Sequence, residues 1–138
     1  DVLGMISLEM IGYFKDEPAS QSYPIGILSA FYGNKGNYIT LVKKFGAGRF
    51  VRHFVKRFKS ADKIRTKTFA GPPKLPGIDF SDHLNYWKFG FGALMITDTS
   101  FYRNKNYHQK TDTMETLDIA RMSKVIDSVY DSLISMRL

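Results

Sequence analysis

Short apolar runs with strand character alternate along this chain with helical segments, and this alternation limits the fold more than any other feature. Strands are predicted at residues 2–11, 64–69 and 93–97. Helices are predicted from apolar periodicity or capping residues at 48–60, 81–89 and 113–136. Residues 38–42 fit either a short strand or the start of a helix. Alternation of this kind favours an α/β fold, here a mixed β-sheet flanked by helices.

The size and composition fit one globular domain. The chain has 138 residues, of which 43% are apolar and 24% are charged. No window approaches 18 consecutive apolar residues, so we expect no membrane span. The absence of cysteine excludes disulfides and thiolate metal sites. Because the sequence is apolar from Val2 onward, we expect residues 1–138 to be a single-domain fragment that opens inside a buried strand.

Positive charge is concentrated in one segment. Ten of the twenty lysines and arginines lie between Lys43 and Lys67, against one acidic residue, Asp62. Such a segment has the electrostatics of a polyanion contact, and a polyanion-binding module at 43–67 is one alternative function. However, Phe50, Phe54 and Phe58 recur every four residues, which predicts a helix packed on a sheet. No nucleic-acid motif accompanies the charges, so we do not expect a nucleic-acid partner.

Two residues have positions typical of metal ligands. Glu9 lies toward the end of the first predicted strand, and open α/β sheets bind ligands at the carboxyl ends of strands. His108 lies in the loop that follows the predicted strand 93–97, just before a helix capped by Asp112 or Thr113. A neutral imidazole at such a place can bind a divalent metal, although a solvated loop histidine fits the local sequence as well.

Residues 76–118 carry a series of short motifs in a specific order. After the stiff loop of residues 71–77, the series runs Gly77-Ile78-Asp79-Phe80-Ser81-Asp82-His83, Ala93-Leu94-Met95-Ile96-Thr97-Asp98-Thr99, Arg103-Asn104, Tyr107-His108 and Asp112-Thr113-Met114-Glu115-Thr116-Leu117-Asp118. In this order and spacing the chain resembles the C-terminal half of the zinc-dependent aminopeptidases. That family includes bacterial leucyl aminopeptidases and, more distantly, glutamate carboxypeptidase and glutaminyl cyclase.

The resemblance implies a zinc-exopeptidase-like fold, of which this chain is the C-terminal portion, and a peptide substrate. His108 matches the family's last zinc ligand. Leu8-Glu9-Met10-Ile11-Gly12-Tyr13 matches a segment whose ligand to the other zinc is usually aspartate. Ser81 and Asp82 correspond to residues that support the site from behind, and Ser81 is expected to hydrogen-bond Glu9. The family's pocket for the substrate's N-terminal residue corresponds to Met10, Phe101, Tyr102 and Tyr107.

The family's mechanism needs more than these residues. Its members use two zinc ions, a bridging aspartate and a glutamate that takes a proton from the bridging water. The first histidine, the bridging aspartate and a Glu-Glu pair come from sequence upstream of the Glu9 segment, and none is present here. At Ile78, some members have a tyrosine that assists the transition state. We therefore expect the intact protein to be an aminopeptidase and this chain alone to be inactive.

Further alternatives concern the site and the assembly. Ser81-Asp82-His83 is not a catalytic triad, because three consecutive residues cannot align a nucleophile, a base and an orienting group. A glutaminyl-cyclase-like protein would use one zinc for acyl transfer, keeping His108 as a ligand without requiring Glu9.

With its N-terminal half missing, the fragment would expose an apolar sheet edge, so we expect it to self-associate. Family members are often periplasmic or secreted, but no leader is visible to test this.

Overall fold

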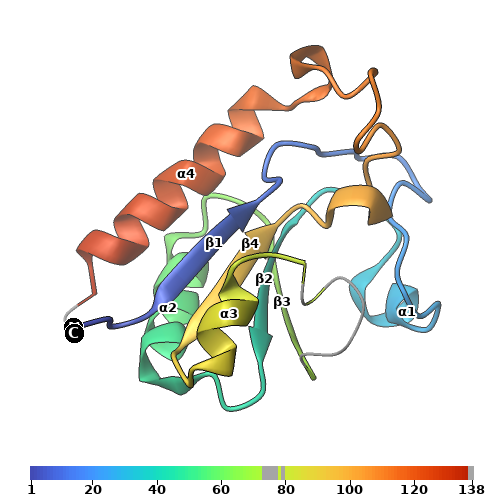
Figure 1. Cartoon of the computed structure of the whole chain (residues 1–138). Coiled ribbons are helices and arrows are strands. Elements are labelled where there is room, and N and C mark those ends of the chain that lie inside the picture. The colour runs from blue at the N-terminus through green and yellow to red at the C-terminus, as the bar shows by residue number, and fades with distance from the viewer. Residues whose placement is uncertain (73–77, 79, 137–138) are drawn as a thin grey trace.

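The computed structural model describes residues 1–72, 78 and 80–136; most of the predicted loop at 71–77 lies outside the described residues. Four strands form one mixed sheet in the order β1-β4-β2-β3 (Figure 1). They span Met5–Glu9 (β1), Ile39–Lys44 (β2), Thr66–Gly71 (β3) and Ala93–Thr97 (β4). β1 is parallel to β4 and β2 to β3, while β2 and β4 are antiparallel. The predicted mixed α/β fold is confirmed.

Four α-helices accompany the sheet: Leu28–Tyr32 (α1), Gly48–Ala61 (α2), His83–Lys88 (α3) and Ile119–Ile134 (α4). Short 3-10 turns lie at Ser100–Tyr102 (η1) and Met114–Thr116 (η2). Among the described residues, no helix is both long enough and apolar enough to cross a bilayer.

The two faces of the sheet have separate cores. On one face, α2 and α4 bury Val51, Phe54 and Val125 against Ile39 and Ile96. On the other face, α3 packs Trp87 against Val42, Ala93 and Met95. Because successive strand residues point to opposite faces, Thr40, Met95 and Thr97 share the α3 face. This face carries the site described below.

Several predicted elements have different bounds in the structure. Residues 39–44 form a strand, which resolves the choice that the sequence left open. The first strand is shorter than predicted because Met10 adopts a left-handed conformation (φ 50°) directly after Glu9. α1 was not predicted; it is a single turn of five residues with no buried side chain to create periodicity.

Both predicted N-caps beyond residue 80 were wrong. The N-cap of α3 is Asp82 and not Ser81, whose hydroxyl group instead lies 2.5 Å from that of Ser7. The last helix begins at Ile119, not at 113, and its N-cap is Asp118, whose carboxylate accepts a hydrogen bond from the backbone of Arg121. The segment before it forms η2 and then extends at Leu117 (ψ 142°).

Candidate functional site

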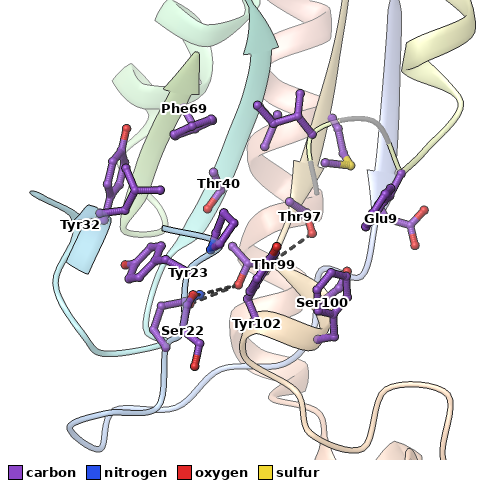
Figure 2. A pocket seen from close by; sticks show the side chains of 18 of the residues that line it. Glu9, Ser22, Tyr23, Tyr32, Thr40, Phe69, Thr97, Thr99, Ser100 and Tyr102 are labelled. Carbon is purple, nitrogen blue, oxygen red and sulfur yellow. Dashed lines mark hydrogen bonds between the residues drawn. The ribbon is translucent and has the colours of Figure 1, made fainter. Parts of the chain in front are cut away.

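A pocket of about 100 Å³ opens on the α3 face of the sheet, where β1 and β4 end (Figure 2). Its floor comes from all four strands, through Glu9, Thr40, Val42, Phe69, Met95 and Thr97. Glu9 and Thr97 are register partners at the carboxyl ends of the parallel pair β1 and β4. The sequence-based position of Glu9 at a strand end is therefore confirmed, and Glu9 is one of the residues that line the pocket.

Aromatic side chains form much of the wall. Phe80 lies 6.0 Å from Phe101 between ring centroids, and Phe101 lies 4.4 Å from Tyr102 and 5.8 Å from Tyr107. The opposite wall comes from Tyr23, Pro24, Leu28 and Tyr32 on and before α1. Of the four residues predicted to line a pocket, Phe101, Tyr102 and Tyr107 do so. Met10 is not among the lining residues; its carbonyl accepts a hydrogen bond from the backbone of Asp98.

His108 lies at the outer end of this aromatic chain. Its ring stacks on that of Tyr107, with a centroid distance of 3.9 Å and an interplanar angle of 17°. The imidazole is exposed, and the backbone of His108 is left-handed (φ 59°). Stacking therefore places the predicted metal ligand beside a residue that lines the pocket, although His108 itself does not line it.

The loop that carries Tyr107 and His108 is fixed by a buried asparagine. Asn104 is fully buried, and its side-chain amide donates to the Asp112 carboxylate at 2.9 Å. Its side-chain carbonyl accepts from the backbone of Asn106, also at 2.9 Å. These two bonds close the loop around His108. Asp112, predicted as a helix cap, thus serves as the acceptor that closes this loop.

Two buried charged groups tie the pocket loops together. Asp98 is fully buried and accepts hydrogen bonds from the backbone of Tyr13 at 2.8 Å and of Ser100 at 3.0 Å. Burial raises the pKa of Asp98 to about 6, while these hydrogen bonds and Arg103 act in the opposite direction. Arg103 donates to the Gln21 side chain at 2.8 Å and to the Tyr13 carbonyl at 3.1 Å. These bonds therefore tie the end of β4 to residues 13–21 and to η1.

Cations support the tyrosine wall from outside the pocket. Tyr38 is 1% exposed, and its hydroxyl group lies 2.8 Å from that of Tyr23. Lys67 places its ammonium group 3.8 Å from the centre of the Tyr38 ring, and Arg103 lies 4.8 Å from the same centre. Burial, followed by the nearby arginines, lowers the pKa of Lys67 to about 8. Both contacts have cation–π geometry and add an attractive interaction to this wall.

Polar atoms in the pocket differ in how well they are satisfied. Thr97 accepts a hydrogen bond from the backbone of Thr99 at 3.0 Å. The Thr40 hydroxyl group is buried and has no hydrogen-bond partner within the part of the chain that the structure describes. Buried polar groups in proteins are normally paired. The Thr40 hydroxyl group is therefore a buried polar group that the described residues leave unpaired beneath the pocket floor.

Ser81 and Asp82 do not line the pocket. The expected hydrogen bond between Ser81 and Glu9 is not the one formed, because the Ser81 hydroxyl group contacts Ser7 on β1. Asp82 is exposed at the start of α3. His83 is buried, with Nε2 2.6 Å from the Ile78 carbonyl and its ring edge against Trp87. These contacts anchor α3 to the sheet and give the tripeptide a structural role.

The described residues do not form a complete metal site. Nowhere among residues 1–72, 78 and 80–136 do three His, Cys, Asp or Glu side chains come together as metal ligands. Glu9 and His108 are the right donor types for zinc, which normally takes at least three protein ligands. Their role as ligands stays a prediction.

Sequence reasoning missed the wall formed by Tyr23, Leu28 and Tyr32, because residues 21–38 show no regular apolar pattern. It also gave no role to Asp98, Arg103 and Asn104 beyond their place in the motif series. The sequence did contain a signal for the network of these three residues, because they lie in the segment that follows the apolar run 93–97.

Comparison with known proteins places this geometry in context. No protein-family description matches the chain. Over 125 residues it is 43% identical to the uncharacterized protein YfbL of Escherichia coli K12. The aligned region covers 91% of this chain but only 39% of YfbL. The structure is similar to the LapA aminopeptidase of Legionella pneumophila, with a TM-score of 0.58 and 17% identity over 99% of this chain and 32% of that one. The chain therefore spans less than two fifths of either protein, and its fold is like part of an aminopeptidase.

Proposed function

We propose that this chain forms the part of a zinc-dependent aminopeptidase that binds the N-terminal residue of a peptide. The observation that carries the proposal is the pocket itself. It is apolar and aromatic, Glu9 is one of its lining residues, and it lies beside the loop that holds His108. The aminopeptidase-like fold supports this assignment.

The pocket dimensions favour an aliphatic side chain. An apolar cavity of roughly 150 Å³ accommodates a benzene ring. The present pocket of about 100 Å³ is smaller but open to solvent on one side, and we propose a side chain of about leucine's size as its occupant. In the isolated chain, where Glu9 holds no zinc, we expect its side chain at the pocket to attract the charged amino group of the bound residue.

We further propose that Glu9 and His108 each bind one of two zinc ions in the intact protein. Zinc would there supply Lewis acidity and an activated water molecule. Two ligands from this chain do not complete either site, and the general base is expected elsewhere, so the isolated chain is expected to be inactive. Its contribution is to recognise and orient the substrate.

Recognition can be tested on the isolated chain with three small probes. Leucine amide and glycine amide carry the same charge but differ by one side chain, and N-acetyl-leucine amide lacks the free amino group. In an amide NMR titration, leucine amide should shift the signals of Thr40, Thr97 and Phe101. Glycine amide should bind at least about tenfold more weakly because it buries no apolar side chain. N-acetyl-leucine amide should also bind more weakly than leucine amide, because it has no charged amino group to attract Glu9.

A pair of matched variants locates the binding. Phe101→Ala removes one wall and should weaken leucine amide binding by about tenfold. Phe89→Ala removes an equally large exposed ring from a turn outside the pocket and should change nothing. Equal binding of the leucine and glycine probes, or shifts that map away from the pocket, would contradict the proposal.

A further inference from the structure

Two exposed aromatic turns lie side by side at the end of the sheet remote from Glu9 and Thr97. One turn follows β2 and carries Phe45, which is 68% exposed. The other follows α3 and carries Phe89, which is 80% exposed. A side chain at Gly92 would lie 3.1 Å from the Ala47 carbonyl, so the two turns are in contact. Both are at the lower end of the sheet in Figure 1.

Cationic side chains lie on the two turns or close to them in the sequence. Arg49, Arg52 and Lys88 are exposed, and the described residues include no ion pair to any of them. Lys44 donates to the Trp87 carbonyl at 3.4 Å, which joins the two turns. Residues 44–52 and 84–93, which carry the two turns, contain no aspartate or glutamate. The two turns and their flanks are therefore cationic with apolar tips, and we call this surface, with Arg49, Arg52 and Lys88, the basic end.

The shape of the basic end limits what it can bind. Its residues line neither the pocket beside Glu9 and Thr97 nor the hollow between Tyr13 and Arg103. Single-stranded nucleic acids bind in grooves that combine cations with stacking surfaces. Phenylalanine rings on protruding turns instead suit shallow insertion into a bilayer interface, with nearby cations contacting anionic headgroups.

The rest of α2 sets the depth of such a contact. Val51, Phe54 and Phe58 are buried in the core, so this helix has no apolar side left to insert. Its cationic side, including Arg49 and Arg52, is free to lie along headgroups. We propose that the basic end binds the surface of an anionic lipid bilayer, with Phe45 and Phe89 as the inserted side chains.

The test is co-sedimentation of the whole chain with vesicles. Vesicles of phosphatidylcholine with phosphatidylglycerol should retain the protein, while pure phosphatidylcholine vesicles should not, and added salt should release it. Phe45→Ser with Phe89→Ser should weaken partitioning by at least about tenfold, and so should Arg49→Glu with Arg52→Glu. All four positions are exposed or on turns, so circular dichroism should be unchanged.

Matched controls lie away from the basic end. Phe31 on α1 is 78% exposed, so Phe31→Ser removes a similar ring without touching the basic end. Lys105 and Lys110 are exposed in the His108 loop, so Lys105→Glu with Lys110→Glu reverses the same number of charges. These controls should keep at least most of the binding.

Three outcomes would overturn the proposal. The first is no retention on anionic vesicles. The second is equal loss in the control variants, which would indicate a diffuse charge effect. The third is binding of single-stranded nucleic acid, or self-association, that depends on Phe45 and Phe89 while vesicle binding does not.

Discussion

At the scale of single residues, Asp98 and Arg103 determine how the pocket loops are held. Asp98 is fully buried and accepts two backbone hydrogen bonds from segments that are distant in sequence. Its neighbour Arg103 bonds to Gln21 and to the Tyr13 carbonyl. A change at either residue should therefore alter the pocket without touching a bound ligand.

The raised pKa of Asp98 predicts a specific pH dependence. The pKa is 3.8 for an ordinary aspartate and about 6 in the folded chain, so the folded state binds more protons between these values. The stability contributed by this group is complete below pH 3.8 and falls as the pH rises to about 6, by at most about 3 kcal/mol. Urea unfolding should show this decline in the difference between wild type and Asp98→Asn. A difference that is constant from pH 4 to 7 would contradict it.

Two threonines on the pocket floor predict opposite effects of the same substitution. The Thr40 hydroxyl group is buried without a partner among the described residues, so Thr40→Val should stabilise the chain by about 1 kcal/mol. Thr97 accepts a hydrogen bond from Thr99, so Thr97→Val should destabilise it by about 1 kcal/mol. Urea midpoints of the two variants compare them directly. Destabilisation by Thr40→Val would mean that its hydroxyl group is paired in solution.

At the scale of secondary structure, the sequence predicted what depends on local patterns. α2 was predicted nearly to its bounds because Phe54 and Phe58 keep helical spacing over fourteen residues. β4 was predicted because Ala93–Thr97 is a short, mostly apolar run, as expected of a strand that is buried throughout. Residues 38–42 stayed ambiguous because β2, central in the sheet, is buried on both faces and shows no alternation.

Elements and contacts that depend on distant partners could not be predicted. The start of α4 was misplaced because Asp112 and Thr113 look like caps, whereas Asn104 engages Asp112 in the folded chain. The partner of Ser81 was wrong because only the packing of α3 on β1 brings Ser7 beside it. In the site, the aromatic residues after β4 were identified from the family resemblance, but the wall from α1 is assembled by tertiary folding alone.

The position of the α4 cap gives a stability prediction. Asp118 accepts a hydrogen bond from the Arg121 backbone and pairs with its guanidinium at 3.4 Å. Asp118→Ala should therefore cost about 1 kcal/mol. Thr113→Ala, at the cap position that the sequence predicted, should cost less than about 0.5 kcal/mol, because its side chain caps no α-helix. Chemical denaturation of both variants compares these two losses of stability. A larger loss for Thr113→Ala than for Asp118→Ala would place the helix start at 113.

At the scale of the whole molecule, the exposed edge of the sheet is the main feature. β1 pairs with β4 on one side only, and Leu8 on this edge is 49% exposed. Exposed apolar edge strands tend to pair with other chains. Near this edge, α4 also leaves Ile126 and Tyr130 exposed, at 49% and 63%.

Self-association through β1 is the expected consequence. Sedimentation velocity should show a dimer or larger species that grows with protein concentration. Leu8→Lys places a charge on the edge and should shift the population toward monomer. Phe31→Ser, remote from β1, serves as the control for general loss of apolar surface. A wild-type chain that stays monomeric at high concentration would contradict the prediction.

The central claim is that the apolar pocket and the metal-ligand positions belong to one site. The most direct measurement is calorimetric titration of leucine hydroxamate with and without zinc, because this probe joins a pocket-sized side chain to a zinc-chelating group. If the claim is correct, zinc and the probe strengthen each other's binding by at least about tenfold. His108→Ala and Glu9→Gln should each reduce this coupling, while His53→Ala on α2 should leave it intact. Independent binding of zinc and probe, or equal effects of His108→Ala and His53→Ala, would contradict the account.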